Sequence, residues 1–123
     1  MLDTSPLTAA VERFADRLRA APQSRLQQGA AETALDLARE LSLRAQRLEA
    51  AAAGPGDGTG AAPARTMPDA GIFVVGDQLA VAGLDLAEAL QAAAAGPDTA
   101  KAPSEMLDEA VRLVDQAEAG ALR

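Results

Sequence analysis

The chain has 123 residues and a net charge of −7, 49% of its residues are apolar, and it contains no His, Cys, Tyr or Trp. These absences exclude imidazole acid–base catalysis, thiolate nucleophiles, disulfides and the usual imidazole or thiolate metal sites. We therefore expect a non-catalytic protein without a cofactor or metal. Alanine and leucine, both strong helix formers, dominate the apolar residues, so we expect an all-α fold.

Two helices are predicted in the first half of the chain. The first covers residues 5–21, with Ser5 as its N-cap. The second covers residues 24–53 and begins with a capping box, in which Ser24 and Gln27 satisfy each other's free backbone groups. Proline or glycine follows each helix and marks its end.

A segment rich in glycine and proline, residues 54–68, follows and is predicted to be a flexible linker. It spans at most about 50 Å, which is enough to cross the length of a bundle. Two further helices are predicted at 67–95 and 103–120. Short or direct connections favour an up-down-up-down order, although a crossing linker stays open.

Each predicted helix carries an apolar seam at steps of three and four residues, as helices crossing at about +20° require. The seam residues are Leu7, Val11, Phe14 and Leu18; Leu26, Ala30, Ala34, Leu37, Leu41, Ala45 and Leu48; Ile72, Val75, Leu79, Ala82, Leu86 and Ala89; and Leu107, Ala110, Val114, Ala117 and Ala121. The pattern predicts a single domain, residues 1–123, that forms a four-helix bundle with two short outer helices and two long central ones.

Four consecutive bulky apolar residues, at 72–75, cannot all face one side of a helix. A short strand and a fully enclosed core segment are two explanations. A third follows from the helix lengths, because an up-down-up-down order would leave the ends of the two long helices uncovered. A homodimer would cover them. The predicted dimer interface is Leu43, Leu48, Ile72, Phe73, Val74 and Val75. If the linker crosses the bundle, this hypothesis loses its basis.

The charge is divided unevenly along the chain. Residues 1–68 hold eight acids and eight bases, whereas residues 69–123 hold ten acids and three bases. An acidic surface of this kind suits a basic protein partner, although a merely solvated face is the simpler explanation. The predicted acidic face is Asp77, Asp85, Glu88, Glu105, Asp108, Glu109 and Asp115. Direct nucleic-acid binding is not expected, because the half that holds most of the bases is neutral overall and its single aromatic, Phe14, belongs to the predicted apolar seam.

A stripe of small residues in the third helix, Gly76, Ala80, Gly83 and Ala87, indicates close approach by another group. Tight packing of a neighbouring helix, a dimer seam and a ligand groove are the three explanations. We therefore expect a cytoplasmic interaction module that self-associates and presents its acidic face to a basic protein partner. The alternative is a bundle that binds a small apolar or amphipathic ligand in this groove. No membrane span is predicted, since acids interrupt the most apolar stretch.

Overall fold

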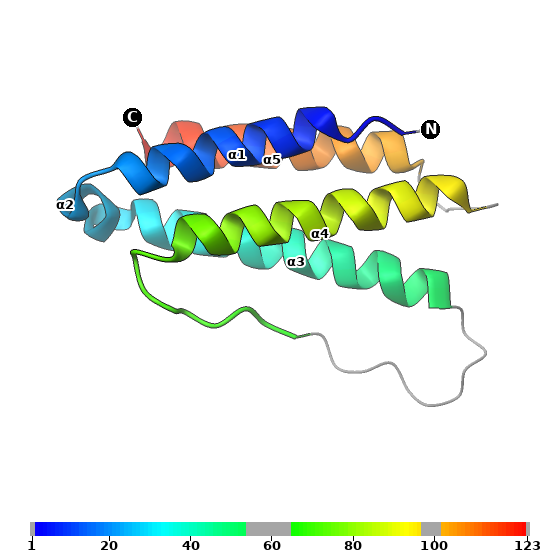
Figure 1. The fold of residues 1–123 in the computed structure, drawn as a ribbon, viewed down its shortest axis with the longest axis horizontal. Coiled ribbons are helices and arrows are strands. Elements are labelled where there is room, and N and C mark those ends of the chain that lie inside the picture. The colour runs from blue at the N-terminus through cyan, green and yellow to red at the C-terminus, as the bar shows by residue number, and fades with distance from the viewer. Residues whose placement is uncertain (1, 54–64, 97–101, 123) are drawn as a thin grey trace.

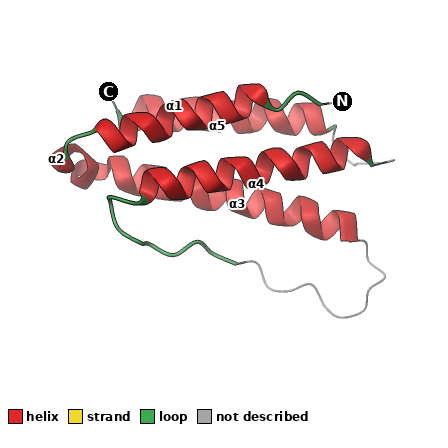
Figure 2. Cartoon of the chain, viewed as in Figure 1, coloured by secondary structure: helices red, strands yellow, loops and turns green. Residues whose placement is uncertain are grey.

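The computed structural model describes residues 2–53, 65–96 and 102–122. Four long helices pack against one another, which confirms the all-α four-helix prediction (Figure 1). They are α1 (Ser5–Ala20), α3 (Ala31–Ala53), α4 (Val75–Ala95) and α5 (Pro103–Ala121). A short turn of helix, α2 (Gln23–Arg25), and a π-helical segment, η1 (Leu26–Ala30), join α1 to α3. Figure 2 shows that the regular structure of the described residues is helical.

The order of the helices differs from the predicted one. α1 packs against α4 and α5, and α3 packs against the same two helices, so the consecutive helices α1 and α3 lie diagonally across the bundle. α3 and α4 run in the same direction, and α1 and α5 run in the opposite direction (Figure 1). The up-down-up-down expectation is therefore wrong.

The reason is the segment at residues 65–74, here called the strap, which runs back along α3. The backbone N–H of Arg65 donates to Gln46 Oε1 over 2.7 Å, and Arg39 Nε, two turns earlier in α3, donates to the Met67 carbonyl over 2.8 Å. Gln78 Nε2 then donates to the Pro68 carbonyl over 2.8 Å. The strap thus delivers the start of α4 to the first half of α3. Of the predicted 54–68 linker, residues 54–64 lie outside the described part.

The expected pattern of two short and two long helices is also wrong. α4 has 21 residues and α5 has 19, so these two are nearly equal, while α1 has 16 and α3 has 23. The predicted third helix began too early. Asp69 Oδ1 accepts a hydrogen bond from the Gly71 N–H over 3.0 Å, and Gly71 has φ 103°, so this stretch forms a turn instead of a helical start.

The predicted second helix is interrupted near its beginning. Gly29 has φ 121° within η1, a backbone conformation that glycine adopts without steric cost. No side chain caps α2, whose N-cap is Pro22, so the predicted capping box does not form. The π-helical segment bends the chain just before α3, as such segments commonly do.

The core agrees with the predicted seams. All seam residues of α1 are buried, and so are those of η1 and α3 up to Ala45. Phe14 and Leu41 are completely buried. Only Leu48, Ile72, Ala117 and Ala121 are half-buried at the margin of the core.

Candidate functional site

The stripe of small residues on α4 is covered by α1. A Cβ atom added at Gly83 would lie 2.7 Å from Val11 Cγ1, and one added at Gly76 would lie 3.2 Å from the Ala15 carbonyl oxygen. Ala87 is buried as well, and Ala80 is half-buried. The predicted ligand groove is therefore filled by helix packing, and the glycines serve the close approach of α1 and α4.

The six residues of the predicted dimer interface do not form one surface. Ile72 and Val75 line a groove together with Leu35 of α3. Leu48 lies 13 residues beyond Leu35, or about 20 Å along the helix. Val75 is buried, Leu43, Leu48 and Ile72 are half-buried, and only Phe73 and Val74 are exposed. The dimer was predicted from an up-down-up-down order that left two helix ends uncovered. Because the helices do not have that order, this reason for a dimer no longer holds.

The predicted acidic residues lie on two sides of the bundle, because α4 and α5 are diagonal neighbours. Several are engaged with arginines of other helices. Asp77 accepts from Arg19 Nη2 over 2.6 Å, and this hydrogen bond raises the pKa of Arg19. Asp115 lies 3.1 Å from Arg13, and Glu109 lies 3.4 Å from Arg44. Arg44 also contacts Glu40, so its guanidinium is paired with two acids.

Glu118 is a buried acid that the predicted face did not include. Its Oε1 accepts from Arg13 Nε over 3.3 Å, and its Oε2 lies 3.2 Å from Arg17 Nη1 in an ion pair that lacks hydrogen-bond alignment. Arg17 also donates to the Leu122 carbonyl over 3.0 Å. These contacts join α1 to α5 and give the arginines of α1 a structural role.

The outward side of α4 carries the exposed apolar residues. Among the described residues, the large hydrophobic side chains that are exposed are Phe73 (75%), Val74 (37%), Val81 (53%) and Leu84 (53%). On a helix of 3.6 residues per turn, positions 74, 81 and 84 fall within about 80° of one another. Asp85 and Glu88 point into the same sector and are exposed. We call these six residues the α4 outer surface.

Two members of this surface, Val81 and Leu84, were not among the predicted interface residues. Their signal was in the sequence, because they fall outside the buried seam of Val75, Leu79 and Leu86. A large apolar residue off the buried seam of a bundle helix has no core to enter. The α4 outer surface is thus where the described residues expose large apolar side chains.

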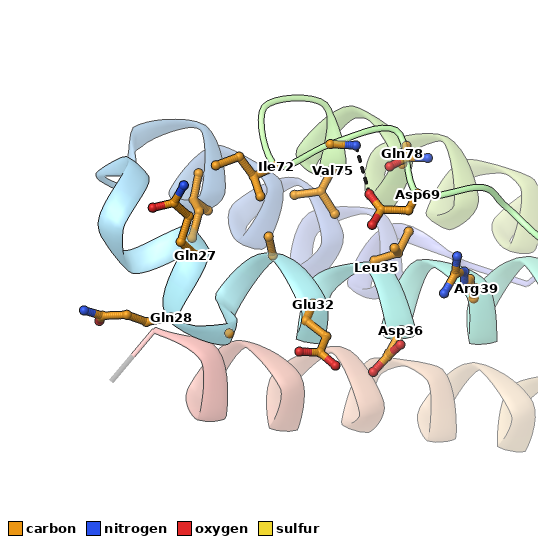
Figure 3. A pocket seen from close by; sticks show the side chains of 14 residues that line it. Gln27, Gln28, Glu32, Leu35, Asp36, Arg39, Asp69, Ile72, Val75 and Gln78 are labelled. Carbon is orange, nitrogen blue, oxygen red and sulfur yellow. Dashed lines mark hydrogen bonds between the residues drawn. The ribbon is translucent and has the colours of Figure 1, made fainter.

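A second feature is a groove of about 670 Å³ between the first half of α3 and the strap (Figure 3). Leu26, Leu35, Ile72 and Val75 contribute apolar side chains to it. Its charged residues are three acids and one base, namely Glu32, Asp36, Asp69 and Arg39. Gln27, Gln28 and Gln78 contribute amides. Sequence reasoning did not find this groove, since it depends on the strap returning along α3.

The polar groups of the groove are positioned by the strap. Because Arg39 Nε is bound to the Met67 carbonyl, the guanidinium is held at one end of the groove. Because Gln78 Nε2 donates to the Pro68 carbonyl, its Oε1 is directed away from the strap; this oxygen is buried and accepts no hydrogen bond from the described residues. A buried acceptor without a donor costs about 1–3 kcal/mol of stability.

Within the described parts of the chain, no group of three or more acids is placed to hold a metal ion. The helices seen in those parts are also too short or too polar to cross a bilayer. Comparison with models of protein families, with curated proteins and with solved structures gave no match.

Proposed function

We propose that this protein is a non-catalytic helical interaction module that docks a basic, amphipathic helix of a partner protein on the α4 outer surface. The observation that carries the proposal is the confinement of the exposed large hydrophobics, among the described residues, to α4 and the turn before it. Contiguous exposed apolar area on a folded protein commonly marks a binding surface.

The spacing of the exposed residues fits a helical partner. Val74, Val81 and Leu84 follow one another at steps of seven and three residues, as the anchors of a helix laid along another helix do. From Val74 to Glu88 the surface extends about 21 Å, or four turns. A partner helix of that length presents three or four apolar side chains to it.

The charge of the surface favours a basic partner over a second copy of this chain. Asp85 and Glu88 form no ion pair with any described residue, so both carboxylates are available. In a symmetric pair of α4 outer surfaces these carboxylates would meet like charges, which is unfavourable. Lysine or arginine beside the apolar anchors of a partner would instead meet opposite charges.

The test uses a site-specific photo-crosslinker at position 84 and, as a control, at position 108 on the exposed side of α5. The expected result is capture of the same protein from cells at position 84 alone. Binding of the purified captured protein is then measured at two salt concentrations. Affinity should fall as salt rises, because exposed charges are screened beyond about 8 Å at physiological ionic strength.

A matched pair of variants locates the surface. Asp85→Lys with Glu88→Lys changes the charge of α4, and Glu105→Lys with Asp108→Lys makes the same change on α5. The first pair should slow association markedly and the second should not. Equal effects of the two pairs would refute the proposal. A stable dimer of the chain alone that Leu84→Asp dissociates would replace the basic partner by self-association.

A further inference from the structure

We infer that the partner helix lies along the junction of α4 and α1, and that it carries basic residues on both borders of its apolar stripe. This inference rests on the proposed function, because it concerns the same surface and names the kind of partner more closely. It adds one residue of α1, Glu12, to the docking surface.

The small residues of α4 bring α1 close enough for one partner to touch both helices. A Cβ atom added at Gly83 would lie 2.7 Å from Val11 Cγ1, so the two helices are closer here than a larger residue would permit. Packed helices have axes about 8–10 Å apart, and small residues at the contact give the shorter separations. Side chains on the facing side of α1 are therefore within reach of a helix laid along α4.

The register of α1 against α4 places Glu12 beside Leu84. The two helices run in opposite directions (Figure 1), and Arg19 Nη2 donates to Asp77 over 2.6 Å. Seven residues, or about two turns, back along α1 from Arg19 is Glu12, and seven residues forward along α4 from Asp77 is Leu84. The close contact of α1 with Gly83, one position before Leu84, lies at the same level of the bundle.

Glu12 has a free charge at this level. It is exposed and forms no ion pair with a described residue. Two turns away, Arg19 pairs with Asp16 and Asp77, so these acids are compensated within the chain. The demand for an external cation on the α1 side of the surface is therefore located at Glu12.

The apolar stripe of α4 thus has an unpaired carboxylate on each side. On a helix of 3.6 residues per turn, Leu84 lies about 60° from Val81 on the side that faces α1, and Asp85 lies about 40° from Val81 on the other side. Glu12 borders the stripe beyond Leu84. A partner with lysine or arginine on one border meets one of these two carboxylates, whereas a partner with basic residues on both borders meets both, as the e and g positions of coiled coils do.

The experiment measures the binding of three designed peptides by fluorescence anisotropy. Each has about 14 residues, or four turns, with leucine at heptad positions a and d and the same hydrocarbon staple between the two f positions. The border peptide has lysine at e and g and glutamine at b and c. The two one-sided peptides have lysine at e and b or at g and c, and glutamine at the other two positions. Composition and net charge are equal, and we expect the border peptide to bind about two- to fivefold tighter than either one-sided peptide.

A matched pair of variants assigns this advantage to α1. Glu12→Gln should remove the advantage of the border peptide, because one border then faces no charge. Glu105→Gln on α5 makes the same change in net charge and should leave the advantage intact. Circular dichroism shows whether each variant keeps its helix content.

The outcomes separate this inference from the proposed function. Equal affinity of the three peptides for the unmodified chain overturns the inference, as does an advantage that survives Glu12→Gln or is lost equally in Glu105→Gln. Absence of binding by all three peptides also overturns it. If Leu84→Asp abolishes binding while Glu12→Gln changes nothing, the inference is wrong and the proposed function stands. Binding that Leu84→Asp leaves unchanged would contradict both.

Discussion

Substituting Gly83 by alanine tests the packing of α1 against α4 directly. The added Cβ would lie 2.7 Å from Val11 Cγ1 and 2.9 Å from Cγ2, distances shorter than carbon atoms tolerate without a shift. Valine on a helix is held in one rotamer, so rotation cannot remove both methyl groups from the new atom. The two helices must therefore separate locally.

The magnitude follows from two opposing contributions. Overpacking a core contact costs about 1–3 kcal/mol, while replacing glycine by alanine inside a helix stabilises by about 0.8–1.0 kcal/mol. We expect Gly83→Ala to lower the free energy of unfolding by about 1 kcal/mol, and by up to about 2 kcal/mol. Gly120 in α5 has no atom within 4 Å of an added Cβ, so Gly120→Ala should stabilise by up to about 1 kcal/mol.

Urea denaturation followed by circular dichroism measures both changes. Gly76→Ala should fall between the other two variants, because its Cβ would meet the Ala15 carbonyl oxygen at 3.2 Å. Adding Val11→Ala to Gly83→Ala removes the clash, so the double variant should be more stable than the sum of the single effects implies. If Gly83→Ala stabilises the protein as much as Gly120→Ala does, α1 and α4 do not pack closely at this position.

Three further predictions concern the core and the charges. Phe14→Ala should cost about 3–5 kcal/mol in urea denaturation, because the ring is completely buried, and a loss below about 1 kcal/mol would remove Phe14 from the core. Glu118→Gln should lower the free energy of unfolding by about 1–2 kcal/mol; the loss is limited because Arg13 and Arg17 are half-exposed, and solvent weakens each ion pair. The same change at the exposed, unpaired Glu88 should alter the free energy of unfolding by no more than about 0.5 kcal/mol. Hydrogen bonds with Ser5 lower the pKa of Asp3 below its usual 3.8, so the stability that these hydrogen bonds provide is complete above pH 3.8 and is lost as the pH falls through the folded-state value. An NMR titration of Asp3 that shows a pKa above 3.8 would contradict this.

The sequence predicted the helices and their buried faces because both are local properties. Steps of three and four residues placed Val11, Phe14 and Leu41 in the core, and the structure confirms all three. Alanine-rich composition required only that some helical neighbour cover each seam. It did not determine which neighbour, since the seams of different helices are chemically alike.

The predicted up-down-up-down order was wrong because the order of the helices depends on long-range contacts of the strap. Nothing near Arg39 in the sequence indicates that its Nε binds the Met67 carbonyl 28 residues later. The groove could not be predicted for the same reason. Asp69, Gln78 and Leu35 line one groove only because the strap returns along α3. Gly71 was a usable signal that was overlooked, since a glycine three residues after Pro68 argues against a helix there.

The diagonal arrangement of α1 and α3 has a consequence for how the chain folds. Consecutive helices that pack together can form a local hairpin early. Here α1 packs against α4 and α5, which come later in the chain, and not against α3. Its ion pair between Arg13 and Glu118 joins residues 105 positions apart. Chains dominated by such distant contacts fold more slowly than bundles of sequential hairpins, because loop closure precedes the gain from packing. During synthesis, α1 therefore has no packing partner until α4 has been made, and its second partner, α5, is made last.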